Sequence, residues 1–152
     1  MSRAFVKEDD DAPEELPERP ISAAPNLVTA RGLELIDAEI ARLTAELQAS
    51  SEDDRDGRAR LNRDLRYWNA RRGSAQLMQP PADRDRVHFG STVVIDREDG
   101  RRQTFQIVGE DEADPEAGTI SHVSPLARAL MGKGVGDVVN VAGSEAEIVE
   151  IR

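Results

Sequence analysis

The chain has 152 residues and a mass of 16.7 kDa, which suffices for one ordinary domain or one small domain with an appendage. It contains no cysteine and only two histidines, which excludes disulfides, thiolate zinc sites and a histidine-rich metal site. A formal net charge of -10 argues against binding to free DNA or RNA. No apolar run approaches a membrane span, and the acidic N-terminus lacks the apolar core of a signal peptide, so we expect a cytoplasmic protein with no membrane partner.

The first segment of the chain is acidic and rich in proline. Residues 1–25 carry three positive charges, seven negative charges and four prolines. Such a segment cannot bury enough apolar surface to offset the entropy lost on ordering. The composition therefore predicts a flexible tail over residues 1–28.

Residues 29–79 show the pattern of two helices packed on one another. Apolar residues recur at spacings of 3, 4, 3 and 4, a coiled-coil seam, in the set Leu33, Ile36, Ile40, Leu43 and Leu47. Thr29 is placed to cap this first helix. Gly57 and the charged run before it break the pattern, which resumes in the set Leu61, Leu65 and Trp68, with Arg72 and Ala75 in the same phase. The pattern predicts an antiparallel helical hairpin, with arms of about 22 residues and about 33 Å.

Charge is distributed unevenly along this hairpin. The turn between the helices is acidic and contains Glu52, Asp53, Asp54 and Asp56. Residues 58–79 carry six arginines against one aspartate, and the half near the turn holds Arg58, Arg60, Arg63 and Arg66. Both features also have a simpler interpretation, because an acidic turn and a basic helix face can serve only to keep a surface solvated.

A second domain follows the hairpin. Pro80 and Pro81 end the second helix and begin a linker over 80–86. From residue 87 to 152 the pattern predicts strands at 93–95, 104–108, 138–141 and 147–151, with a turn at Asp99-Gly100. Ser124 and Pro125 predict the start of one short helix. We expect an α+β fold in which a helical hairpin precedes a small antiparallel sheet with one helix.

This arrangement resembles the GreA/GreB transcription elongation factors. The resemblance is carried by four segments: Val87-x-Phe89-Gly90-Ser91-x-Val93, Ile107-Val108-Gly109-Glu110-x-Glu112-Ala113-Asp114, Ile120-Ser121-x-x-Ser124-Pro125-Leu126-Ala127-x-Ala129-Leu130 and Gly136-Asp137-x-Val139. The motif Thr29-x-x-Gly32 at the start of the hairpin agrees with it, and residues 5–9 and 15–20 are similar to GreB-like proteins. The resemblance covers nearly the whole chain, is strong over 87–141 and is weak at the hairpin tip.

The resemblance implies a mode of action. The C-terminal domain would be FKBP-like and dock on bacterial RNA polymerase at the secondary channel through Ser121, His122, Val123, Ser124 and Pro125. The hairpin would enter the channel as part of a monomer, and the tip carboxylates Glu52, Asp53, Asp54 and Asp56 would reach the polymerase magnesium. The protein would then be no enzyme itself and have no cofactor or stable metal of its own, sharing the magnesium only transiently. Its basic strip, Arg58, Arg60, Arg63 and Arg66, would face the nascent RNA 3′ end within the complex.

Two alternatives stay open. The tip lacks the Asp-x-Ser-Glu-Asn-Ala-type motif of cleavage factors and the arms are shorter, which resembles the Rnk-type regulators that do not act as cleavage factors. Such a regulator would occupy the channel and compete with other channel factors. A peptidyl-prolyl isomerase is a more distant alternative, because the C-terminal domain has only Phe89 and Phe105 as aromatic residues for a substrate pocket.

Overall fold

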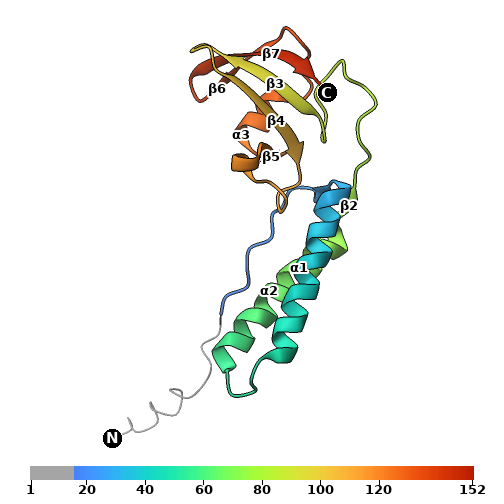
Figure 1. The fold of residues 1–152 in the computed structure, drawn as a ribbon, viewed down its shortest axis with the longest axis vertical. Helices are drawn as coiled ribbons and strands as arrows, with labels where there is room; N and C mark the ends of the chain where they lie inside the picture. The colour runs from blue at the N-terminus through green and yellow to red at the C-terminus, as the bar shows by residue number, and fades with distance from the viewer. Residues whose placement is uncertain (1–15) are drawn as a thin grey trace, which may run out of the picture.

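A computed structural model describes residues 16–152, and the part of the predicted tail at 1–15 lies outside the described residues. The molecule is elongated, with a hairpin of two long helices that projects from a sheet domain (Figure 1). The helices are α1 (Ala30–Ala49) and α2 (Arg55–Ser74), and both lie within the range 29–79 assigned to the hairpin from sequence. No helix within residues 16–152 has the length and apolarity needed to cross a bilayer.

Side-chain caps define the ends of the hairpin helices. The Thr29 hydroxyl accepts a hydrogen bond from the backbone N–H of Gly32 at 3.0 Å and so caps α1. Asp54 caps α2 in the same way, accepting from the Gly57 N–H at 3.1 Å. The predicted break is found in the charged run before Gly57, between Ala49 and Arg55, whereas Gly57 itself lies in the first turn of α2. Each helix has 20 residues, which corresponds to about 30 Å.

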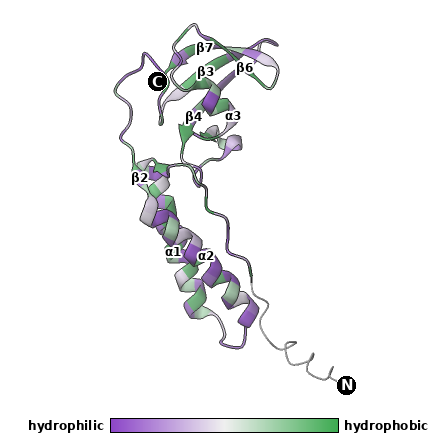
Figure 2. Ribbon diagram, turned by 180° about the vertical axis from the view of Figure 1, so that it is seen from behind, coloured by the Kyte–Doolittle hydropathy of each residue, from purple (hydrophilic) through white to green (hydrophobic). Residues whose placement is uncertain are grey.

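The seam between the helices buries few large side chains. Ile36 and Leu43 are 1% and 2% exposed, while the other apolar residues of the seam are only half-buried. On α2 the phase differs from the prediction, because Arg71 is buried and Arg72 lies exposed in an ion pair with Asp37. Hydrophilic residues recur along both helices (Figure 2). The hairpin thus has a thin apolar interface and depends on contacts at its base.

Two short strands clamp that base. Strand β1 (Leu27–Val28) enters α1 and pairs in parallel with β2 (Gln76–Leu77), which leaves α2. Ahead of β1, residues 16–26 run in an extended conformation beside the hairpin, seen in blue in Figure 1. Over residues 16–28, the predicted tail is thus a segment in contact with α2.

The C-terminal domain is built on a five-stranded sheet in the order β5-β4-β3-β7-β6. Its strands are β3 (Thr92–Arg97), β4 (Arg102–Val108), β5 (Thr119–Ser121), β6 (Val138–Val141) and β7 (Ser144–Ile151). All neighbours are antiparallel except β4 and β5, which pair in parallel. The α+β class is confirmed, and the parallel strand β5, which the sequence did not predict, makes the sheet mixed.

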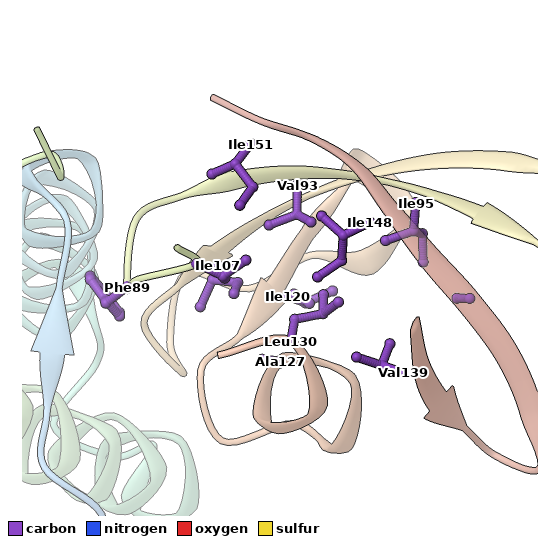
Figure 3. Close-up of a cluster of buried hydrophobic side chains, with 12 residues drawn as sticks. Phe89, Val93, Ile95, Ile107, Ile120, Ala127, Leu130, Val139, Ile148 and Ile151 are labelled. Atoms are coloured by element: carbon purple, nitrogen blue, oxygen red, sulfur yellow. The ribbon is translucent and has the colours of Figure 1, made fainter. Parts of the chain in front are cut away.

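One short helix covers the sheet. Helix α3 (Pro125–Leu130) begins at the N-cap Ser124, whose hydroxyl accepts from the Ala127 N–H at 3.2 Å. Ala127 and Leu130 point from α3 into a cluster of aliphatic side chains from β3, β4 and β7 (Figure 3). Phe89 closes this cluster on the side nearest the hairpin (Figure 3). The core thus fixes the loop before α3 relative to the sheet.

Candidate functional site

The tip of the hairpin is an exposed acidic turn. Glu52, Asp53, Asp54 and Asp56 are all exposed, and they lie in the turn and the first residues of α2. Asp54 differs from the other three, because its carboxylate is used to cap α2. Within residues 16–152, no group of three or more His, Cys, Asp or Glu side chains is arranged to hold a metal ion. The structure therefore separates one structural carboxylate from three that face solvent.

The predicted basic strip is largely paired within the molecule. Arg58 donates to the Ser50 hydroxyl at 2.8 Å and to the Leu47 carbonyl oxygen at 3.3 Å, so it closes the turn between the helices. Arg63 pairs with Asp64 at 3.2 Å, and Arg66 pairs with Glu18 at 2.6 Å. Arg60 is the member of the strip without a partner among the described residues.

The side chain of Arg60 is exposed on the face of α2 nearest the tip. The structure places the four arginines along one helix, as the sequence predicted, but in different environments. Arg58 is part of the turn, whereas Arg60, Arg63 and Arg66 lie on the helix beyond it. Only these three could meet a ligand without opening the turn.

The loop before α3 is held by backbone and side-chain hydrogen bonds. The His122 N–H donates to the Val108 carbonyl at 2.9 Å, and the Val123 N–H donates to the Ser121 hydroxyl at 3.2 Å. Pro125 is exposed at the first position of the helix. The residues proposed for docking, Ser121 to Pro125, therefore form one continuous and well-braced loop.

His122 has an unusual environment within this loop. Its ring lies edge-on to Phe89 with centroids 5.5 Å apart, and its buried Nε2 has no partner among the described residues. Burial lowers the pKa of His122 below its ordinary value, and the charges of Arg128 and Arg71 act in the same direction against that of Glu110. The neutral imidazole is therefore the form that fits the folded protein.

A buried ion pair joins the hairpin to the sheet domain. The side chain of Arg71 is 2% exposed, and its Nε donates to Asp111 at 2.5 Å. The Tyr67 hydroxyl donates to the other oxygen of the same carboxylate, also at 2.5 Å. Burial, and after it the hydrogen bond to Asp111, raises the pKa of Tyr67 to about 12, so the hydroxyl keeps its proton. We call the contact between α2 and the loop after β4 the joint.

The joint also engages the segment that enters α1. Arg71 donates to the amide oxygen of Asn26 at 2.7 Å, and the Asn26 amide donates to the Arg71 carbonyl at 2.8 Å. On the other side, the Thr29 hydroxyl donates to Glu112 at 2.6 Å. Entry segment, α2 and sheet domain are thus linked through a single guanidinium and its neighbours.

Two glycines allow the parts of the joint to approach closely. A Cβ on Gly109 would lie 2.5 Å from the backbone oxygen of Leu27, which cannot move without opening the joint. A Cβ on Gly32 would lie 2.7 Å from the Glu112 carboxylate. The motif Thr29-x-x-Gly32 and the motif at 107–114, far apart in sequence, therefore meet in space.

Sequence reasoning missed the joint, although part of its signal was present. Spacings of three or four residues after Trp68 lead to Arg71 or Arg72. The sequence pattern predicted Arg72 for the seam, whereas Arg71 is the buried residue. The acidic run Glu110-Asp111-Glu112 lies in the motif 107–114 that carries the resemblance, but the sequence does not indicate which residue it pairs with. Carboxylates that pack against another segment need a cationic partner, so this acidic run was the signal that could have pointed to a buried arginine on α2.

Replacing Arg71 tests the joint. The change Arg71→Ala leaves the Asp111 carboxylate buried without its cation, so we expect a loss of about 3–5 kcal/mol in the free energy of unfolding. The matched control is Arg72→Ala, which breaks the exposed pair with Asp37 and should cost about 1 kcal/mol or less. Urea unfolding followed by circular dichroism measures both. Equal losses in the two variants would contradict the role given to Arg71.

His122 predicts a pH dependence of stability near neutrality. The pKa of His122 in the folded protein lies below its unfolded value of about 6.5. Its contribution to the free energy of unfolding is therefore fully present above pH 6.5 and is lost as the pH falls below that value. The variant His122→Phe keeps the packing against Phe89 and removes the titration. The loss between pH 7.5 and 5.5, measured by urea unfolding, should shrink in this variant and persist in the control His88→Gln. A loss that is unchanged in His122→Phe would refute the assignment.

Comparison with known proteins agrees with this architecture. A family model described as "Transcription elongation factor, GreA/GreB, C-term" matches residues 81–152. Transcription elongation factor GreA of Alkalilimnicola ehrlichii is 37% identical over 151 residues, which cover 82% of this chain and 96% of that protein. Transcription elongation factor GreA of Ralstonia nicotianae is 37% identical over 149 residues, covering 82% of this chain and 94% of that protein.

Among solved structures, GreA factor homolog 1 (Gfh1) of Thermus thermophilus is similar over 85% of this chain and 99% of that chain, at 21% identity and a TM-score of 0.42. The assignment to a family depends on the sequence relatives and not on this likeness. GreA/GreB proteins are transcription elongation factors rather than enzymes themselves, and they act with RNA polymerase. With 37% identity over nearly the full length of such relatives, the chain belongs to the GreA/GreB family of transcription elongation factors.

Proposed function

We propose that this protein binds bacterial RNA polymerase as a monomer in the cytoplasm, inserts its hairpin into the secondary channel and assists cleavage of the transcript in backtracked complexes. The observation that carries this proposal is that the two helices of the hairpin hold the acidic tip away from the sheet domain (Figure 1). A narrow prong can enter a channel that a globular surface cannot.

The tip carboxylates have the chemistry that the proposal requires. Carboxylate oxygens are the protein ligands that Mg²⁺ prefers, and Glu52, Asp53 and Asp56 are exposed at the end of the hairpin. Magnesium held by the polymerase would polarise a phosphate oxygen and activate water. The exposed tip carboxylates would act as additional ligands of this magnesium, while Asp54 keeps the first turn of α2 in place.

The basic face of α2 would attract the extruded RNA. Arg60, Arg63 and Arg66 follow the tip along one helix, so a strand leaving the polymerase active site would pass them in turn. Guanidinium groups bind phosphate with two parallel hydrogen bonds. The overall charge of -10 opposes binding to nucleic acid elsewhere on the surface, which favours contact only within the complex.

The loop from Ser121 to Pro125 is proposed to dock on the rim of the channel. It is braced by hydrogen bonds and begins a helix, so it would lose little entropy on binding. The joint connects it to the hairpin, because Asp111 lies in the loop that follows β4 and His122 bonds to Val108 at the end of that strand. Docking would therefore fix the direction in which the hairpin points.

Neutralising the tip tests the cleavage activity. The triple variant Glu52→Gln, Asp53→Asn, Asp56→Asn should lower the rate of RNA cleavage in a stalled, backtracked complex at least about tenfold, because magnesium loses its added ligands. The charge-matched control is Glu116→Gln, Glu145→Gln, Glu147→Gln on the exposed surface of the sheet domain. Shortened RNA on a sequencing gel is the readout. If the unaltered protein binds the complex tightly but leaves the RNA intact, the cleavage activity is refuted and the protein is a regulator that occupies the channel. The 20-residue arms favour that alternative.

A charge at Pro125 tests the docking loop. The variant Pro125→Glu keeps the Ser124 cap and places an acidic residue where a helix tolerates it, so the melting temperature should stay within a few degrees. Its affinity for RNA polymerase should fall at least about tenfold, because docking would bury an unpaired charge. Pro115→Glu, at the first position of the 3-10 helix Pro115–Ala117, is the matched control. An unchanged affinity in Pro125→Glu removes this loop from the interface.

A further inference from the structure

The segment that precedes β1 covers the basic face of α2. We call residues 16–26 the strap. Leu16 lies near Asp56, Ala59 and Arg60 at the tip, and Asn26 bonds to Arg71 at the base. The strap therefore follows α2 along its length, in the same direction as the helix, and lies beside it in Figure 1.

Glu18, near the first residue of the strap, occupies an arginine of the basic face. Glu18 accepts hydrogen bonds from Arg66 at 2.6, 2.9 and 3.0 Å, which is the fork geometry that a phosphate group would also adopt. The next residue, Arg19, pairs with Asp64 at 3.5 Å and lies with its guanidinium 3.9 Å from the centre of the Tyr67 ring. The strap thus presents a carboxylate to Arg66 and a cation to the rest of that surface.

The two ends of the strap differ in how firmly they are held. At the base, Asn26 is 4% exposed and is bonded to a buried arginine. Near the tip, the side chains of Glu18 and Arg66 are 62% and 56% exposed, so water and salt weaken their attraction. The strap can therefore release Arg66 while it stays anchored at the joint.

We propose that the strap is an intramolecular competitor for RNA, in which Glu18 holds Arg66 until a phosphate of the extruded transcript displaces it. This inference rests on the proposed function, since it assigns a regulation to the same basic face. A tethered carboxylate acts at a high effective concentration, so dilute free RNA does not displace it. Transcript held in the polymerase channel is also confined beside α2, so it reaches a comparable effective concentration and displaces Glu18. The strap thus restricts the basic face to RNA within the complex.

The test measures binding of a fluorescein-labelled 15-nucleotide oligouridylate to the full chain by anisotropy at low salt. Glu18→Gln should bind it about two- to fivefold more tightly than the unaltered protein, because the exposed competitor is removed. The matched control is Glu150→Gln: like Glu18, Glu150 is exposed and has its pKa lowered by a hydrogen-bonded arginine, here Arg152. This control should not change the affinity, although it alters the net charge equally.

A double variant separates competition from a general effect of charge. If Glu18 acts by occupying Arg66, the gain from Glu18→Gln should disappear in an Arg66→Gln background. In the free protein, Glu18→Gln should also make Trp68 more accessible to acrylamide, because the strap carries Arg19 to within 5.8 Å of this ring, which belongs to the only tryptophan.

The outcomes distinguish this inference from the function on which it rests. The inference is overturned if Glu18→Gln binds the oligonucleotide no more tightly than Glu150→Gln does. It is overturned equally if neither variant binds detectably. A gain that persists in the Arg66→Gln background overturns it as well. Failure of the unaltered protein to bind RNA polymerase would instead refute the proposed function, and that is measured separately with the backtracked complex.

Discussion

The ion pair between Arg71 and Asp111 is the contact on which the projecting hairpin depends. A prong attached at one end acts as a lever, so a small rotation at its base moves the tip by many ångströms. The pair is buried, and it is extended by Tyr67, which donates to the second oxygen of Asp111, and by Asn26, which accepts from Arg71. Because desolvation offsets much of the attraction within a buried pair, we assign its value to geometry more than to net stability.

The hairpin needs this base because its own interface is thin. Only Ile36 and Leu43 of the apolar seam are nearly fully buried, and α2 carries arginines where a stronger coiled coil would have leucines. Contacts outside the seam compensate for this, with Arg58 closing the turn at one end and the parallel pair of β1 and β2 closing the other. Arg60 stays exposed on α2, whereas Arg63 and Arg66 are held by carboxylates of the same molecule.

Much of the fold could be predicted from local chemistry, whereas the contacts between distant segments could not. Thr29 and Ser124 mark helix starts because a hydroxyl before a helical stretch has one strong use, and both cap as expected. Strand β5 was missed because three residues offer too little pattern, and its partner β4 is identified only by tertiary structure. The order of elements was therefore accessible, and the parallel pairings were not.

The candidate site was predictable to a similar extent. Acidic tip residues and arginines on one helix follow from the sequence, but which of them are engaged does not. Asp54 is a cap, Arg58 closes the turn and Glu18 occupies Arg66, and each of these depends on a neighbour in space. Composition alone made the strap resemble a free tail, because acidic, proline-rich segments rarely dock.

The joint holds the hairpin in one direction relative to the sheet domain. The native chain has no cysteine, so spin labels can be placed uniquely at Ser51→Cys in the tip and Asp99→Cys in the β3–β4 turn. Pulsed electron paramagnetic resonance between the two labels should give one narrow distance distribution, which broadens when Arg71→Ala is added. A broad distribution in the unaltered background, or a short distance from a tip folded back onto the sheet domain, would contradict the account.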